Sequence, residues 1–182
     1  MSLRLFAALD VPDEIAARVA PLQRGVPGAR WRPRENLHVT LRFYGEIAEN
    51  VAGDLDAELG EVALKHARFE LKLKGAGFFG REAPGALWLG LAESAALAAL
   101  AADCDRAARR CRIAPSEHKF RPHMTVAYLA GTTLDRAIAF EKRLALYESE
   151  SWTADAFFLL SSHVRRNAPS LYSEEASYPL AG

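Results

Sequence analysis

Two short stretches of the chain pair a histidine with a threonine at the same spacing, His38-x-Thr40 and His123-x-Thr125. In a β-strand, residues i and i+2 point to the same face and lie about 6.6–6.8 Å apart along the chain. Each stretch would therefore present an imidazole and a hydroxyl together, with an apolar residue behind them. The chain has five histidines and five threonines among 182 residues, so chance would give roughly 0.14 such triplets.

Two such strands could cleave a phosphodiester in line without a metal ion. A histidine titrates near pH 6.5, so a neutral and a protonated imidazole can coexist near neutrality. The neutral ring can take a proton from attacking water, and the protonated ring can give one to the leaving oxygen. Two threonine hydroxyls can donate hydrogen bonds to the non-bridging phosphate oxygens. The alternative is that both histidines are ordinary strand residues without a catalytic role.

The surrounding pattern alternates between strands and helices. Strands are predicted at residues 3–9, 37–44, 69–73, 87–91, 123–129, 152–160 and 171–179. Helices are predicted from residues 11–14 to a stop at 25–28, from Asn50 to 66, over 93–111 and over 134–146. Hairpin-like and crossover connections both occur, which favours an α+β fold with mostly antiparallel sheet and helices on one face.

The two motifs are 85 residues apart, close to half of the chain. This separation predicts two related lobes that each give one strand to a shared cleft. No linker with a shift in composition divides the sequence, so residues 1–182 are interpreted as one domain.

The overall charge argues against a protein that binds nucleic acid by bulk charge. Lysine plus arginine and aspartate plus glutamate both number 23, and the formal net charge is zero, so a polyanion site must be a local patch. Basic residues precede both motifs. Arg30, Arg32 and Arg34, with Trp31 among them, precede the first, and Lys119 and Arg121 precede the second. Such a patch suits a short RNA end, and a solvated, charge-balanced face is the alternative.

The lack of a recognisable targeting signal and the two unpaired cysteines predict a cytoplasmic protein. The longest small-apolar run, residues 95–102, is far shorter than the ~20 residues that span a bilayer, and no secretory signal is recognisable. Cys104 and Cys111 are seven residues apart on a predicted helix, about 10.5 Å along its axis. That is too far for a disulfide, so both are expected to be free thiols, packed in the core.

A glycine pattern, Gly75-x-Gly77-x-x-Gly80, matches the dinucleotide-binding fingerprint. That fingerprint requires a helix next, whose N-terminus holds the pyrophosphate. Here residues 81–85 and a predicted strand follow, so these glycines are interpreted as turn and bulge residues.

The chain resembles the two-histidine (2H) phosphoesterase superfamily, and within it the RNA 2′,3′-cyclic phosphodiesterases, also called 2′-5′ RNA ligases. The matching stretches are residues 4–10, 30–45 and 120–127, with shorter matches at 87–90 and 171–172. The resemblance implies a bilobal α+β fold, with two mostly antiparallel sheets, outer helices, a pseudo-twofold axis and a shared central cleft. It also implies metal-independent hydrolysis of RNA 2′,3′-cyclic phosphate to a 2′-phosphate, and it leaves open reversible 2′-5′ RNA ligation.

The resemblance further implies roles for single residues. It makes His38 the proton donor and His123 the proton acceptor, with Thr40 and Thr125 holding the phosphate. It also suggests that Phe6 lines the cleft, although a buried strand aromatic is the alternative.

The family commonly has arginine five residues after the second histidine, where this chain has Tyr128, which offers only a hydroxyl. Phosphate binding is then expected to fall to Arg42, which regular alternation places on the face of His38; a solvated strand residue is the alternative. The candidate substrate-binding residues are thus Arg42, Phe6, Tyr128 and Trp31.

Two rival functions remain open at this stage. One is a related 2H phosphodiesterase that acts on cyclic nucleotides or 2′-5′ oligonucleotides, and the other is a non-catalytic module that binds RNA ends. For the favoured enzyme we expect no metal or cofactor, an RNA with a 2′,3′-cyclic phosphate end as partner, no membrane association and a monomeric state.

Overall fold

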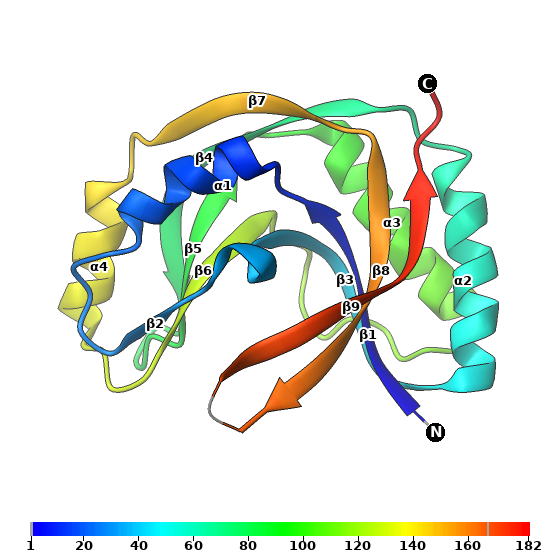
Figure 1. Ribbon diagram of the computed structural model, residues 1–182, viewed down its shortest axis with the longest axis horizontal. Helices are drawn as coiled ribbons and strands as arrows, with labels where there is room; N and C mark the ends of the chain where they lie inside the picture. Colours follow the sequence, from blue (N-terminus) through cyan, green and yellow to red (C-terminus); the bar gives the residue numbers. More distant parts are fainter. Residues whose placement is uncertain (1, 167) are drawn as a thin grey trace.

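The computed structural model describes residues 2–166 and 168–182 and arranges them around two sheets (Figure 1). The four-stranded sheet has the order β3 (His38–Ala48), β1 (Ser2–Asp10), β8 (Ala156–Arg165) and β9 (Ala168–Pro179). The five-stranded sheet has the order β2 (Ala29–Trp31), β6 (His123–Leu129), β5 (Ala86–Leu91), β4 (Phe69–Phe79) and β7 (Glu148–Ala154). Neighbouring strands within each sheet pair antiparallel. The predicted α+β class is confirmed.

In the described part of the chain, four α-helices cover the outer sides of the sheets (Figure 1). Helices α1 (Asp13–Val19) and α4 (Leu134–Arg143) pack beside the five-stranded sheet, and α2 (Glu49–Ala63) and α3 (Ala95–Arg110) pack against the four-stranded one. Short 3-10 turns follow α1, at Ala20–Leu22, and precede β3, at Arg34–Asn36. Within the described residues, no helix is long and apolar enough to cross a membrane.

Helix α3 shows how local sequence sets these elements. The Ser94 side chain accepts a hydrogen bond from the Leu97 backbone N–H at 3.2 Å and so caps the helix start. Leu97, Leu100 and Cys104 follow at helical spacing and are fully buried. As predicted, both cysteines are free thiols and Cys104 packs in the core, but Cys111 is only half-buried at the edge of the core.

Strand β1 is the central element of the four-stranded sheet. It lies between β3 and β8, and residues from Leu5 to Leu9 are at most 3% exposed. A strand paired on both edges and covered on both faces has no polar face, which explains its continuous apolar run.

The prediction of a single strand over residues 152–160 is wrong. The strand breaks at Asp155: β7 pairs with β4 in one sheet, and β8 pairs with β1 in the other. The chain changes sheets at this point, so neither sheet corresponds to one half of the sequence. Helix α2 begins at Glu49 and ends at Ala63, so it starts one residue before and ends three residues before the predicted range.

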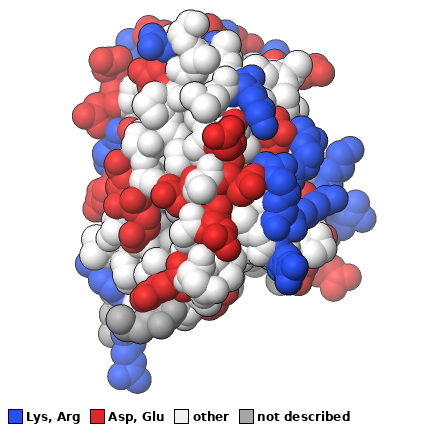
Figure 2. All heavy atoms as spheres, turned by 90° about the vertical axis from the view of Figure 1, so that its right-hand side faces the viewer, with Lys and Arg blue, Asp and Glu red and all other residues white. Residues whose placement is uncertain are grey.

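Charge is unevenly spread over the surface. On the side of the molecule that carries α2, acidic side chains gather in the middle and basic side chains gather along one edge (Figure 2). The zero net charge therefore conceals local patches of both signs.

Gly75 and Gly80 are turn and bulge residues, as predicted, whereas Gly77 is a regularly paired strand residue. The pairing of β4 with β5 shifts between Leu73 and Ala76, and Gly75 and Gly80 adopt positive φ angles of 68° and 95°. Strand β5 follows instead of a helix, so no pyrophosphate-binding helix terminus exists there.

Gly77 has a packing role in the same strand. It pairs with Trp88 on β5, and a Cβ atom added to Gly77 would overlap the indole ring. The Trp88 ring lies 5.6 Å from the Phe79 ring and 6.3 Å from the His123 ring, measured between centroids. Gly77 thus makes room for the indole that lies behind His123.

We expect Gly77→Ala to destabilise the protein by about 1–3 kcal/mol, because the new methyl group overpacks against the indole. Gly53→Ala is the matched control: Gly53 lies in α2 with open space around its Cα, and alanine there should stabilise by about 0.5–1 kcal/mol. Urea unfolding of both variants measures the difference. Equal stability of Gly77→Ala and the parent would contradict the packing role.

Candidate active site

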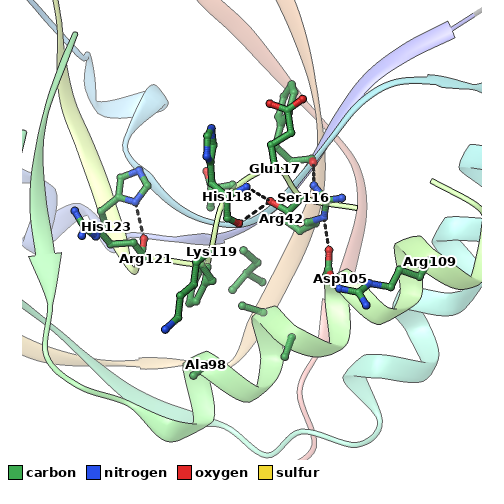
Figure 3. Close-up of a pocket in the computed structure, with 16 residues that line it drawn as sticks. Arg42, Ala98, Asp105, Arg109, Ser116, Glu117, His118, Lys119, Arg121 and His123 are labelled. Carbon is green, nitrogen blue, oxygen red and sulfur yellow. Dashed lines mark hydrogen bonds and ion pairs between the residues drawn. The ribbon is translucent and has the colours of Figure 1, made fainter. Parts of the chain in front are cut away.

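The two His-x-Thr strands come from different sheets and meet in one cleft. Thr40 of β3 and His123 of β6 line the same cavity of about 490 Å³, the larger cavity. Figure 3 shows His123 at this cavity. His38 and Thr40 line an adjoining space of about 170 Å³, the smaller cavity. Thr125 lies half-buried on β6, two residues after His123. The structure therefore brings the two predicted motifs together.

Each of these strands contains a β-bulge just after its threonine. In β3, Thr40 pairs with Ala8 and Arg42 pairs with Ala7, so Leu41 is the extra residue. In β6, Thr125 pairs with Trp88 and Ala127 pairs with Leu87, which makes Val126 the extra residue. A bulge changes the phase of the side chains that follow it. The two motifs are thus alike in backbone as well as in sequence.

The bulges bring the fifth residue after each histidine to the cleft. Phe43 and Tyr128 occupy these positions, are 43% and 42% exposed, and line the smaller cavity together. An arginine guanidinium packs over each ring: the Cζ of Arg4 lies 5.1 Å from the Phe43 ring centroid, and that of Arg32 lies 5.0 Å from the Tyr128 ring centroid. The cleft thus has an aromatic and cationic wall on both sides.

The prediction that Arg42 shares the face of His38 is wrong, because the bulge turns Arg42 toward α3. The Arg42 side chain is 9% exposed and forms an ion pair with Asp105, with Nε and Oδ1 at 2.8 Å (Figure 3). Its terminal nitrogens donate to the backbone carbonyls of Phe43 and Ala114. Arg42 lines the larger cavity, but protein acceptors already engage its guanidinium, and its main effect is to fix β3 to α3.

His38 is enclosed by aromatic rings. The Phe6 ring lies 5.0 Å from the imidazole, and the Tyr172 ring lies 5.3 Å from it with an interplanar angle of 78°. Burial is the largest cause that lowers the pKa of His38, to about 4, and the positive charge of Arg32 lowers it further. The backbone of Asn36 acts in the opposite direction. In the free protein His38 is therefore neutral at pH 7.

His123 is held in one tautomer by the backbone. Its Nδ1 lies 2.7 Å from the Arg121 carbonyl oxygen (Figure 3). Because a carbonyl only accepts, Nδ1 carries the hydrogen, and in the neutral ring Nε2 holds the lone pair. Burial lowers the pKa of His123, and the bond to Arg121 opposes this shift. The ring is packed edge-on against Phe79, with centroids 4.9 Å apart.

The remaining candidate residues have different positions. Phe6 is 3% exposed, packs between His38 and Tyr172 and lines the smaller cavity, so both of its expected roles apply. Tyr128 lies at the cleft. Trp31 packs against Phe140 of α4, with centroids 6.2 Å apart, and lines neither cavity.

Arg32 and Tyr172 belong to the site, although the sequence patterns do not single out either of them as a candidate site residue. Arg32 is 7% exposed, and its Nη2 donates to the Tyr172 hydroxyl at 2.9 Å. A signal for Arg32 was present: it follows Trp31, so if Trp31 packs toward a helix, alternation turns Arg32 toward the cleft. Tyr172 reaches the site through β9, 140 residues from Arg32, and no local pattern reveals such a contact.

Comparison with known proteins places the chain in a family. The model of the 2′-5′ RNA ligase superfamily matches residues 11–166. The chain is 30% identical over 154 residues to an RNA 2′,3′-cyclic phosphodiesterase of Archaeoglobus fulgidus, and the aligned region covers 82% of this chain and 84% of the relative. The corresponding protein of Thermus thermophilus is 29% identical over 189 residues, covering 99% and 91%.

Solved structures agree at the level of the fold. Escherichia coli LigT complexed with 3′-AMP superimposes with a TM-score of 0.82 over 100% of both chains, at 24% identity. A Thermus thermophilus protein has the same TM-score over 98% of both chains. The chain therefore belongs to the 2′-5′ RNA ligase superfamily, whose curated relatives here bear the name RNA 2′,3′-cyclic phosphodiesterase. The resemblance stated from the motifs is confirmed.

Proposed function

We propose that this protein hydrolyses the 2′,3′-cyclic phosphate end of RNA to a 2′-phosphate, without a metal ion, through acid–base catalysis by His38 and His123. The observation that carries the proposal is the pair of His-x-Thr strands, each with a bulge after its threonine, that meet in one cleft. The names of the relatives support the same reaction.

His123 is the proton acceptor in this mechanism. Its Nδ1–H is engaged by the Arg121 carbonyl, so the Nε2 lone pair can take a proton from a water molecule in the cleft. The water oxygen then forms a bond to phosphorus. Hydroxyls of Thr40 and Thr125 donate hydrogen bonds to the non-bridging oxygens, where negative charge develops.

His38 is the proton donor. As the bond between phosphorus and the ribose 3′-oxygen breaks, protonated His38 gives its proton to that oxygen, and the phosphate stays on the 2′ side. In the free protein the pKa of His38 is about 4, so the donor form must be produced with the substrate. A bound phosphate anion favours the charged imidazole and opposes the effect of burial.

The function is tested directly on an RNA oligonucleotide that ends in a 2′,3′-cyclic phosphate, incubated in excess EDTA. We expect complete conversion, seen as the mass gain of one water, and a 2′-phosphate as the only terminal isomer after digestion and chromatography. Activity that EDTA abolishes and a divalent ion restores would contradict the metal-free mechanism.

The other outcomes of this assay separate the rival functions. A 3′-phosphate product would refute the substrate orientation only. Binding without conversion would favour a module that binds RNA ends. Conversion of cyclic mononucleotides or 2′-5′ oligonucleotides alone would favour a related enzyme of the superfamily.

Removing either imidazole should disable turnover while the fold survives. We expect His38→Ala and His123→Ala each to lower kcat/KM by about 10²–10⁴-fold, and the double variant to lose less than the product of the two. His163→Ala is the control, because this exposed histidine lies near the end of β8 and lines neither cavity. A folded single variant with normal turnover would remove that histidine from the mechanism.

The pH profiles should differ between the free enzyme and the complex. Catalysis needs His38 protonated and His123 neutral, and both pKa values are lowered in the free protein. Because kcat/KM reports the free enzyme, it should peak below pH 6.5 and then fall by about tenfold per pH unit. The bound phosphate raises the imidazole pKa values, so kcat should peak at higher pH. A kcat/KM that rises to a plateau above pH 8 would contradict these assignments.

A further inference from the structure

Arg32 places a buried positive charge next to the aromatic wall of the cleft: it lines neither cavity itself, but it packs against Tyr128 and Tyr172, which both line the smaller cavity. It directly follows β2, and its backbone N–H donates to the Val126 carbonyl of β6 at 2.8 Å. The guanidinium Cζ lies 5.0 Å from the Tyr128 ring centroid and 5.9 Å from that of Tyr172. With the hydrogen bond to the Tyr172 hydroxyl, these two rings hold the guanidinium in place.

No carboxylate neutralises this charge within residues 2–166 and 168–182. The contrast is with Arg42, the other buried arginine, which forms its ion pair with Asp105. Of the five side-chain N–H donors of Arg32, only one has an acceptor among the described residues. Burial of a charge without a partner is unfavourable, so the site as it stands is suited to an anion that arrives from outside.

The position of Arg32 indicates which anion that is. Both rings that hold Arg32 line the smaller cavity with His38 and Thr40. Tyr172 contacts both groups: its ring lies 5.3 Å from the His38 ring and its hydroxyl accepts the hydrogen bond from Arg32, so the two groups are close neighbours. In keeping with this, the charge of Arg32 is, after burial, the largest cause that lowers the pKa of His38. If His38 gives its proton to an oxygen on phosphorus, that phosphorus lies next to His38, within the field of Arg32.

We propose that Arg32 provides the phosphate-binding guanidinium of this site and that its ligand is the terminal phosphate group of the RNA, both as cyclic ester and as product. This inference rests on the proposed function. The planar fork of an arginine matches two phosphate oxygens at once. Arg4, which lines the smaller cavity, is solvent-exposed on Phe43, so its charge is screened by water in the free protein.

The proposal explains why tyrosine can stand at position 128. The guanidinium of Arg32 lies over the Tyr128 ring, so β2 brings a positive charge to the place that an arginine side chain on β6 would occupy. It also links anion binding to catalysis: burial and the charge of Arg32 together keep His38 unprotonated, and a bound phosphate offsets the charge of Arg32 and thus favours the donor form.

The test uses Arg32→Met, with Arg136→Met as the control, since Arg136 is an exposed arginine on α4. We expect Arg32→Met to lower kcat/KM for the cyclic-phosphate RNA by about 10–100-fold, the usual worth of a hydrogen bond to a charged group. Arg32→Lys should recover only part of this loss, because an ammonium lacks the fork. Tyr128→Arg added to Arg32→Met should recover at least tenfold, because it returns a guanidinium to the same place.

A second measurement does not depend on turnover. Inorganic phosphate should raise the Tm of the parent protein and of Arg136→Met, because a ligand that binds only the folded state stabilises it. Phosphate should leave the Tm of Arg32→Met unchanged, and calorimetry should show the matching loss of phosphate affinity.

These outcomes separate the inference from the function on which it rests. If Arg32→Met binds phosphate and turns over RNA like the parent, Arg32 does not hold the phosphate. If Arg32→Met loses turnover but keeps its phosphate affinity, its role is structural and the inference fails. If the parent binds phosphate through Arg32 but converts no cyclic-phosphate RNA, the proposed function fails and the phosphate site stands.

Discussion

A β-strand with regular alternation cannot place a histidine, a threonine two residues later and a third side chain five residues later on one face. The extra residue in each catalytic strand, Leu41 and Val126, removes this conflict. Because of it, Phe43 and Tyr128 reach the cleft, while Arg42 turns to α3 and fixes β3 there. The walls of the site and its attachment to the helices follow from the same local change of the backbone.

The site combines two requirements that oppose each other. Aromatic packing fixes the orientation of both imidazoles, but the same burial disfavours their charged forms. A mechanism with one protonated histidine therefore needs a negative charge that arrives with the substrate. Under our proposal the phosphate is that charge, and Arg32 is the buried cation that attracts it. In the free protein both imidazoles are then neutral.

Much of the fold and of the site could be predicted from the sequence, because these features depend on local periodicity. The strands that carry His38 and His123, the helices and the α+β class follow from alternation and helical spacing. The break at Asp155 was missed, because the change of sheet depends on partners far away in the sequence. The same limit explains why the direction of the Arg42 side chain was wrongly predicted. The bulge that turns Arg42 away lies in the pairing of β3 with β1, and Trp31 packs against Phe140 of α4, more than 100 residues away in the sequence.

The most direct test of this account is an NMR titration of the imidazole signals of His38 and His123, with and without saturating inorganic phosphate. In the free protein we expect His38 to titrate near pH 4 and His123 below 6.5. With phosphate, the pKa of His38 should rise toward neutrality, because the anion stabilises the charged ring. If His38 titrates near pH 6.5 in the free protein and does not respond to phosphate, a buried pair that the substrate converts into acid and base is ruled out.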